Sequence, residues 1–253
     1  MKTVSPMATS KSTQETKVKS FCILVVDNVD SAPHEAFKRQ THQDSLSQAR
    51  SGYIKARPLL DFFIAFIGLI FSFPVIFIIG ILIKTTSRGP VFYAQERVGK
   101  DGRIFEIIKF RTMSVDAESL LGPVWAEKND VRITNLGRIL RRTHIDELPQ
   151  LVNVIRGEMS IIGPRPERPF FVNKLKEEIS GYASRLTTKP GITGLAQSYH
   201  RSDETIRDVQ KKLRYDMLYI KRMCLALDIK IILQTLRVSI SGGKWKKKNV
   251  TKS

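Results

Sequence analysis

Cysteine is scarce in this sequence: Cys22 and Cys224 are the only two among 253 residues. They lie far apart, and neither has a companion cluster of His or Cys, so the sequence indicates neither a zinc site nor a scaffold held by a disulfide framework. The start of the chain also lacks a long apolar run. Residues 21–26 are shorter than the roughly 7 to 15 apolar residues of a signal peptide. A cleaved leader is therefore not expected.

Acidic residues are few relative to basic ones, with 24 Asp and Glu against 42 Lys and Arg, which gives a formal charge of +18. Such a surface favours anionic partners: nucleic acid, acidic lipid headgroups or phosphorylated substrates. Binding of single-stranded nucleic acid would require aromatic residues interleaved with the basic ones, and few are present. The sequence therefore argues against nucleic acid and leaves lipids and phosphorylated substrates.

Charge is absent altogether from residues 62–83, which read FFIAFIGLIFSFPVIFIIGILI. A straight helix of this length, at roughly 1.5 Å per residue, could cross a bilayer, and soluble helices rarely stay apolar on every face for so long. We therefore interpret the run as a membrane element. Pro74 removes a backbone donor in its middle, so a break or kink is expected there.

Basic residues flank this membrane element on both sides. Lys55 and Arg57 precede it, and Lys84 and Arg88 follow it. A single crossing keeps Lys and Arg mainly on the cytoplasmic side, so charge at both ends favours a re-entrant helix-break-helix that enters and leaves through one leaflet. Asp61 is spaced to pair with Arg57 one helical turn earlier.

The composition divides the chain into four parts. Residues 1–50 form a polar extension without periodicity, and residues 51–84 hold the membrane element. Residues 85–243 form the main domain, and residues 244–253 form a tail with five lysines and no acid. Such a tail suits either solvated disorder or attraction to anionic lipid.

Within the third part, residues 91–98 and 103–110 predict a β-hairpin around a glycine-bounded turn. Apolar residues at helical spacing predict a helix opened by Asp146, a strong N-cap type, and ended near Gly157. Further helices are expected after the loop Gly-Pro-Arg-Pro at 163–166, after the turn-rich KPGITG at 189–194, and over residues 225–240. The predicted fold class is α+β and mostly helical.

The adjacent carboxylates Asp146 and Glu147 are the candidate chemical centre. The predicted helix N-terminus would keep a carboxylate ionised, and Arg138, Arg141 and Arg142 lie just before it. Such a place could hold phosphate and Mg²⁺ together, so that a neighbouring carboxylate attacks phosphorus. Most Asp-Glu pairs, however, are merely solvated helix starts.

Four long motifs in the chain resemble those of the bacterial sugar transferases, the monotopic polyprenyl-phosphate phosphoglycosyl transferases. They are KARPLLD at 55–61, SRGPVFYAQERVGKDGRIFEIIKFRTM at 87–113, ITNLGRILRRTHIDELPQLVNVIRGEMSIIGPRPERP at 133–169, and KPGITGLAQ at 189–197.

The resemblance implies a two-step reaction. Asp146 attacks the diphosphate of a UDP-sugar and releases UMP, and undecaprenyl phosphate, a polyprenyl phosphate, then takes the sugar phosphate from this aspartate. It implies that Glu147, together with Asp146, holds Mg²⁺. It also implies the first membrane step in making exopolysaccharide, capsule, the O-antigen of lipopolysaccharide, or another glycan.

The resemblance also assigns substrate-binding positions, all of them basic: Lys109, Arg111, Arg141, Arg165 and Arg201. Each has a plainer interpretation. Arg165, for example, could only stiffen its proline loop, and Arg201 could pair with Asp203. The chain departs from the family pattern at His144, two residues before Asp146, where a catalytic role competes with a structural one.

Together these features predict an enzyme of the bacterial inner (cytoplasmic) membrane. The helical catalytic domain would lie along the cytoplasmic face, where the UDP-sugar and the lipid acceptor meet. A homo-oligomer stays open. The alternative is a non-catalytic basic scaffold or lipid-binding protein, which would have no need of the carboxylate pair.

Overall fold

The computed structural model of the chain describes residues 43–114, 130–199 and 205–240. The predicted basic tail, most of the polar extension and Arg201 lie outside these residues. The helices are α2 (Gln43–Thr86), α3 (Asn135–Thr143), α4 (Leu151–Ile155), α5 (Pro169–Glu178), α6 (Leu195–Tyr199), α7 (Ile206–Arg222) and α8 (Leu225–Ile240), with short 3₁₀ turns η2 (Lys100–Gly102), η3 (Ile145–Gln150) and η4 (Tyr182–Thr187). The strands are β1 (Phe92–Val98), β2 (Ile104–Phe110), β3 (Ser160–Ile162) and β4 (Gly191–Thr193). The predicted α+β, mostly helical class is confirmed.

The long helix α2 contains the predicted membrane element and begins earlier, at residue 43. Its stretch Arg50–Thr86 is long and apolar enough to cross a membrane, and only 17% of its most apolar window is buried. Phe71 and Phe73 are 79% and 63% exposed. A soluble core helix would bury such side chains, so the fold supports a membrane element here.

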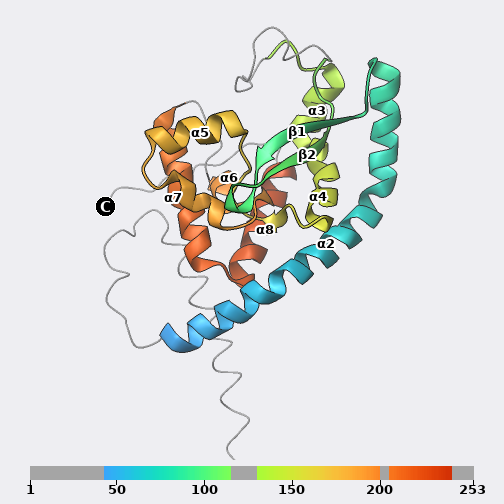
Figure 1. Cartoon of the computed structure of the whole chain (residues 1–253). Coiled ribbons are helices and arrows are strands. Elements are labelled where there is room, and N and C mark those ends of the chain that lie inside the picture. Colours follow the sequence, from blue (N-terminus) through green and yellow to red (C-terminus); the bar gives the residue numbers. More distant parts are fainter. Residues whose placement is uncertain (1–42, 115–129, 200–204, 241–253) are drawn as a thin grey trace, which may run out of the picture.

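A break or kink was predicted at Pro74. The helix is not interrupted there, because α2 continues as one helix through both Pro58 and Pro74. Figure 1 shows instead that α2 is bent, running diagonally below the domain and then upward along its side. Prolines inside a helix cause such bends by removing a donor and crowding the preceding turn.

One narrow stripe of α2 faces the rest of the protein. Its members recur every three or four residues, and those near the middle are small: Arg57, Asp61, Ala65, Gly68, Ser72, Ile76, Ile79 and Ile83. Ile79 and Ile83 pack with Phe110 and Leu140 in one core cluster. Because the stripe is narrow, most of the helix circumference stays exposed and apolar.

A buried polar network fastens the first half of α2. Arg57 donates to Ser160 Oγ at 2.7 Å and to the carbonyl of Ile162, while Ser160 Oγ donates to Asp61 at 2.7 Å. The predicted Arg57–Asp61 pair is present at 3.9 Å. Asp228 on α8 lies at the same distance from Arg57. These buried charges thus stabilise one docking position through mutual pairing.

The predicted hairpin is confirmed. β1 and β2 pair antiparallel from Phe92–Phe110 to Val98–Ile104. Its turn is closed by η2, where Asp101 takes a left-handed conformation at φ 56°. Inward residues Phe105 and Ile107 belong to one core cluster with Ala65 of α2 and Val154 of α4, so the hairpin shares a core with both helices.

The segment KPGITG was predicted as a turn-rich loop, yet residues 191–193 form strand β4, which pairs parallel with β3. Gly163 N donates to Thr193 O at 2.8 Å, and Gly191 N donates to Pro164 O at 3.0 Å. The two motif loops therefore join backbone to backbone, which leaves no room for side chains between them. This close approach explains the glycines of both motifs.

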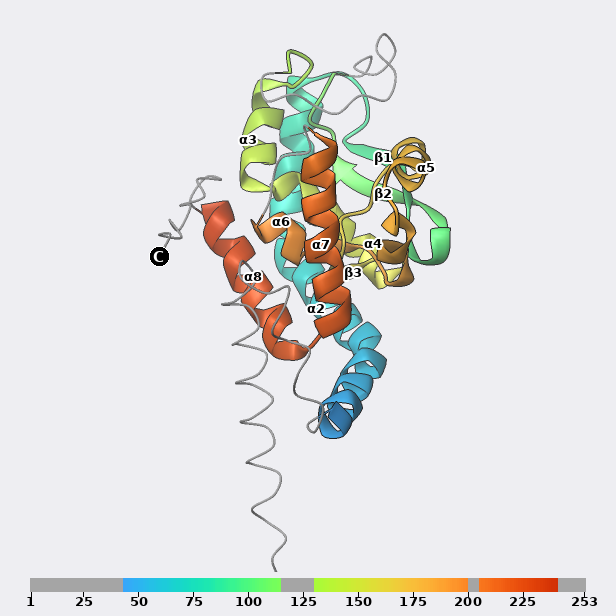
Figure 2. The same ribbon diagram turned by 90° about the vertical axis from the view of Figure 1, so that its left-hand side faces the viewer.

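Helices α5, α7 and α8 complete the domain, and α8 spans the residues predicted for it. Figure 2 shows α7 and α8 side by side in front of α2. Ile162, Tyr219, Leu227 and Ile231 form the core between β3, α7 and α8. The domain therefore packs against α2 on one side, and its core forms around β3 and β4.

The close approach of the two loops predicts the effect of Gly191→Ala. A methyl group there would lie 2.0 Å from Gly163 N, so the loops must separate. We expect destabilisation of at least about 1–3 kcal/mol, as for overpacked sites. Thermal unfolding of the detergent-solubilised protein measures it. Gly52→Ala, with nothing within 4 Å, is the control. Equal melting temperatures for the two variants would contradict this packing.

Candidate active site

Asp146 and Glu147 lie in the 3₁₀ turn η3, directly after α3. The prediction that Asp146 is the N-cap is wrong. His144 caps the turn, in a left-handed conformation at φ 59°, and it also ends α3. This corner turns the chain between two helical segments, and it places Asp146 and Glu147 in the first turn, where both are buried. His144 thus has a structural position at the corner.

Asn153 on α4 ties this turn to the hairpin. Its amide nitrogen donates to Glu106 O and to Glu158 at 2.7 Å each, and its oxygen accepts from Ile108 N at 3.0 Å. Asn153 is fully buried. The sequence analysis missed this residue, because an Asn inside a helical pattern carries no signal of a long-range backbone contact.

Glu147 is held by two cations from distant parts of the chain. Its Oε1 accepts from Lys109 Nζ at 2.9 Å and from Arg165 Nη2 at 2.8 Å. Burial alone would raise the pKa of Glu147, but Arg165 and Lys109 outweigh it and lower that pKa well below its usual range. Burial in turn lowers the pKa of Lys109, which Glu147 partly offsets. Glu147 is therefore ionised across the physiological pH range.

Asp146 has a different environment. Its Oδ1 is buried and has no hydrogen-bond partner. Burial, followed by the charge of Glu147, raises the pKa of Asp146 to about 6, although Lys109, Arg141 and Arg165 act in the opposite direction. The surroundings of Asp146 thus raise its pKa rather than lower it, because desolvation and Glu147 outweigh the nearby cations. At neutral pH it is mostly ionised and unpaired.

The predicted basic residues fall into three groups. Lys109 and Arg165 touch Glu147, and Arg141 acts on Asp146 through its charge. Arg111 instead donates to the carbonyl of Ser87 at 3.0 Å, at the end of α2, and one of its nitrogens is buried without a partner. Arg201 lies outside the described residues.

The carboxylates of Asp146 and Glu147 are oxygen ligands of the kind that a magnesium site uses. In the described part of the chain, no group of three or more His, Cys, Asp or Glu side chains gathers. Mg²⁺ commonly uses one or two carboxylates and completes its shell with water and substrate phosphates. The unpartnered Oδ1 of Asp146 is a buried acceptor of the type that such an ion needs.

Comparison with known proteins gives this site its context. Residues 53–242 match the model of the family described as bacterial sugar transferase. The chain belongs to the bacterial sugar transferase family. The resemblance inferred from the motifs is therefore confirmed, and both carboxylates and all five predicted basic positions of this transferase lie in the matched region.

Three relatives illustrate the similarity. One, from Bacillus subtilis, is 48% identical over 58% of this chain and 82% of its own length, and is provisionally named an undecaprenyl-phosphate N-acetylgalactosaminyl 1-phosphate transferase. Another, from Aeromonas hydrophila, is a UDP-N-acetylgalactosamine-undecaprenyl-phosphate N-acetylgalactosaminephosphotransferase, 40% identical over 72% of this chain and 43% of its own length. A UDP-glucose:undecaprenyl-phosphate glucose-1-phosphate transferase from Klebsiella pneumoniae is 41% identical over 70% and 38%. The transferase thus spans less than half of the last two.

The contrast between the two carboxylates predicts opposite effects on stability. Glu147→Gln removes the charge that holds Lys109 and Arg165 together. We expect a loss of about 2 kcal/mol, less than the roughly 3–5 kcal/mol of a fully buried pair, because Arg165 is partly exposed. Asp146→Asn removes a charge that folding disfavours, and should add roughly 1–3 kcal/mol at pH 8.

The pH dependence follows from the raised pKa of Asp146. The ionised form carries its penalty fully above pH 6, and the penalty disappears as the pH falls below the ordinary value of 3.8. Asp146→Asn should therefore raise the melting temperature at pH 8 and leave it nearly unchanged near pH 4. A shift of both variants in the same direction at pH 8 would refute the assigned difference.

Proposed function

We propose that this transferase moves a sugar 1-phosphate from a UDP-sugar to undecaprenyl phosphate, or a similar polyprenyl phosphate, and releases UMP. Family membership and the names of the relatives support this reaction. The product would be a lipid-linked diphosphosugar, the first membrane step of capsule, exopolysaccharide, O-antigen or other glycan synthesis.

In the proposed first step, an oxygen of Asp146 attacks the β-phosphorus of the UDP-sugar. The bond between this phosphorus and the bridging oxygen breaks, and UMP leaves with that oxygen. The sugar phosphate is then held on Asp146 as an acyl phosphate. In the second step, an oxygen of the polyprenyl phosphate attacks the same phosphorus and releases the carboxylate.

The observation that carries the assignment of the nucleophile is the unequal pairing of the two carboxylates. Glu147 is bound by two cations at 2.9 and 2.8 Å, and this pairing lowers the reactivity of its oxygens. Asp146 has a buried oxygen without a partner and a pKa of about 6. A nucleophilic oxygen must be ionised and must not be held by hydrogen bonds or ion pairs, and Asp146 meets both conditions at neutral pH.

Lys109, Arg141 and Arg165 would offset charge on the phosphates as it develops. Arg165 offers a planar fork for phosphate oxygens, while Lys109 offers a point charge. Asp146 and Glu147 would hold Mg²⁺, which when bound neutralises the diphosphate and orients it. Arg165 is 39% exposed at its side chain, so it faces solvent from which the donor arrives.

The lipid acceptor requires a membrane surface at the site, and two helices provide one. α2 exposes large apolar side chains around most of its circumference. α8 adds an exposed stripe of Leu225, Ile229, Leu233 and Leu236 at helical spacing. Such a stripe suits a helix that lies in the interface, so we place the catalytic domain on the cytoplasmic face of the inner membrane.

The contacts of α2 favour re-entrant geometry. Arg57 and Asp61, before the most apolar stretch, bind β3, and Ile83, after it, packs with Phe110 and Leu140. One domain therefore holds both ends of the segment. A domain that lies on one side of a bilayer can do so only if both ends return to that side.

A scaffold or lipid-binding protein is the alternative function. Basic charge alone would serve it, but a buried carboxylate with a raised pKa beside a second, fully paired one would then bring only an energetic cost. This environment favours the enzyme.

The reaction predicts UMP release from UDP-glucose, UDP-galactose or UDP-N-acetylgalactosamine with undecaprenyl phosphate and Mg²⁺. Asp146→Asn should lower turnover by on the order of 10⁴-fold or more, as losses of catalytic nucleophiles do. Without the acceptor lipid, mass spectrometry should find one sugar phosphate on the peptide that contains Asp146. Glu177→Gln, at an exposed position of α5, is the matched control. Normal turnover in the Asp146 variant would eliminate it as the nucleophile.

The re-entrant geometry predicts where labels react. Ser51→Cys and Arg88→Cys, both exposed, would be made in a chain whose Cys22 and Cys224 are replaced by serine. In inner-membrane vesicles of one orientation, a membrane-impermeant maleimide should label both positions from the same side. Labelling from opposite sides would mean that α2 crosses the bilayer.

A further inference from the structure

The loop that carries Arg165 is held by its carbonyl groups. Four consecutive carbonyls, from residues 164 to 167, each accept a hydrogen bond, and the donors come from β4, η4 and β1. Gly191 N donates to Pro164 O at 3.0 Å, and Val98 N donates to Glu167 O at 2.9 Å. The side chains of Arg185 and Arg97 donate to the two carbonyls in the middle, those of Arg165 and Pro166. The prolines at 164 and 166 lack backbone donors, so this loop depends on its carbonyls.

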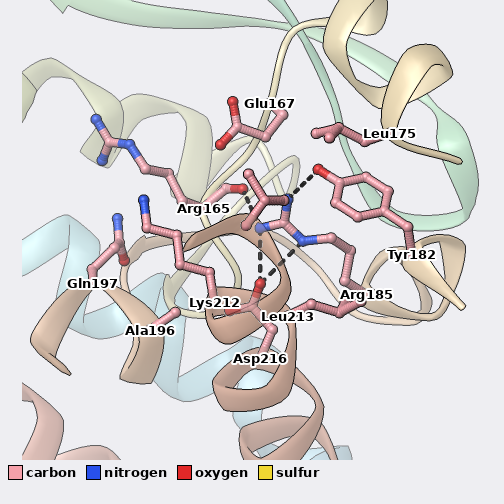
Figure 3. Close-up of a pocket in the computed structure, with 11 residues that line it drawn as sticks. Arg165, Glu167, Leu175, Tyr182, Arg185, Ala196, Gln197, Lys212, Leu213 and Asp216 are labelled. Carbon is pink, nitrogen blue, oxygen red and sulfur yellow. Dashed lines mark hydrogen bonds and ion pairs between the residues drawn. The ribbon is translucent and has the colours of Figure 1, made fainter. Parts of the chain in front are cut away.

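The carbonyl of Arg165 itself is bound by Arg185 of η4, whose Nη2 donates to it at 2.9 Å. Figure 3 shows this arrangement: the carbonyl of Arg165 faces Arg185, while the guanidinium of Arg165 points away from it. That guanidinium reaches Glu147 at 2.8 Å. A chain of direct contacts thus links Arg185, Arg165 and Glu147.

Arg185 is itself fixed from two other directions. Its Nε donates to Asp216 of α7 at 3.0 Å, and its Nη1 donates to Tyr182 Oη at 2.7 Å. Asp216 is 2% exposed and Arg185 is 8% exposed. Asp216 offsets the buried charge of Arg185, so that the rigid guanidinium can present a donor to the loop.

We propose that Arg185 is a positioning residue, which acts by holding the carbonyl of Arg165 so that the guanidinium of Arg165 stays on Glu147 and beside the donor phosphates. This inference rests on the proposed function, because it assigns Arg185 a part in that reaction. Arg185 is separated from the carboxylates by Arg165, and Asp216 supports it from α7.

The first test is Arg185→Lys. A lysine keeps the positive charge beside Asp216 but lacks the fork that reaches two acceptors at once. Misplacement of a positioning group by about 1 Å can cost on the order of 100-fold in rate, so we expect a 10- to 100-fold loss of kcat/KM for UMP release. Arg207→Lys, the same change at an exposed position of α7, should retain turnover within about threefold.

A double-mutant cycle separates positioning from general support of the fold. If Arg185 acts through Arg165, Arg185→Lys should lower kcat/KM 10- to 100-fold in the natural chain and less than about threefold in the Arg165→Ala chain. An equal loss in both backgrounds would overturn the proposal. So would full activity of a folded Arg185→Lys protein.

A second variant serves if Arg185→Lys does not fold. The pair Arg185→Met and Asp216→Leu removes both buried charges at similar volume, a change that proteins often tolerate. It should melt near the natural protein, yet show the same Arg165-dependent loss. Turnover of the unmodified protein, measured in parallel, tests the proposed function itself. Its absence would count against the reaction, whereas normal turnover with unaffected variants would count against the role of Arg185 alone.

Discussion

The carboxylate of Glu147, bound between Lys109 and Arg165, is the contact on which the arrangement of the catalytic motifs depends. It joins β2, η3 and the proline loop, because Lys109 lies 38 residues before Glu147 and Arg165 lies 18 residues after it. A buried carboxylate without cations would be strongly unfavourable, and so would the two cations without it. The three motifs therefore stabilise one another only when all three meet.

This pairing gives the two adjacent carboxylates different surroundings. Because Glu147 takes up Lys109 and the Nη2 of Arg165, Asp146 is left with a buried oxygen that nothing binds. The charge of Glu147 also helps to raise the pKa of Asp146. Two neighbouring residues of similar chemistry thus acquire different properties from their surroundings: Glu147 is paired with two cations, while Asp146, the proposed nucleophile, keeps an oxygen without a partner.

The long apolar helix α2 is joined to this site through the core cluster that it shares with the hairpin. α2 presents Ala65 to a cluster that includes Phe105 and Ile107 of the hairpin, and this hairpin carries Lys109. Small residues in the middle of the stripe let the domain approach the helix closely, while the larger apolar side chains face outward. An exposed apolar surface is thereby held close to the turn that carries the carboxylates, as the proposed reaction between a soluble donor and a lipid acceptor requires.

Local patterns in the sequence determined much of this. The apolar run, the hairpin, helix α8, the carboxylate pair and the family motifs could all be predicted, because periodicity and motif spacing are properties of neighbouring residues. The tertiary structure decided what depends on distant partners. It showed that β4 pairs with β3, that His144 rather than Asp146 caps the turn, and that α2 bends without a gap. It also showed that Arg185 binds the carbonyl of Arg165, that Asn153 joins α4 to the hairpin, and that Glu147 rather than Asp146 is paired. No local pattern reveals these features, because burial and ion pairing arise only when segments far apart in the chain are packed together.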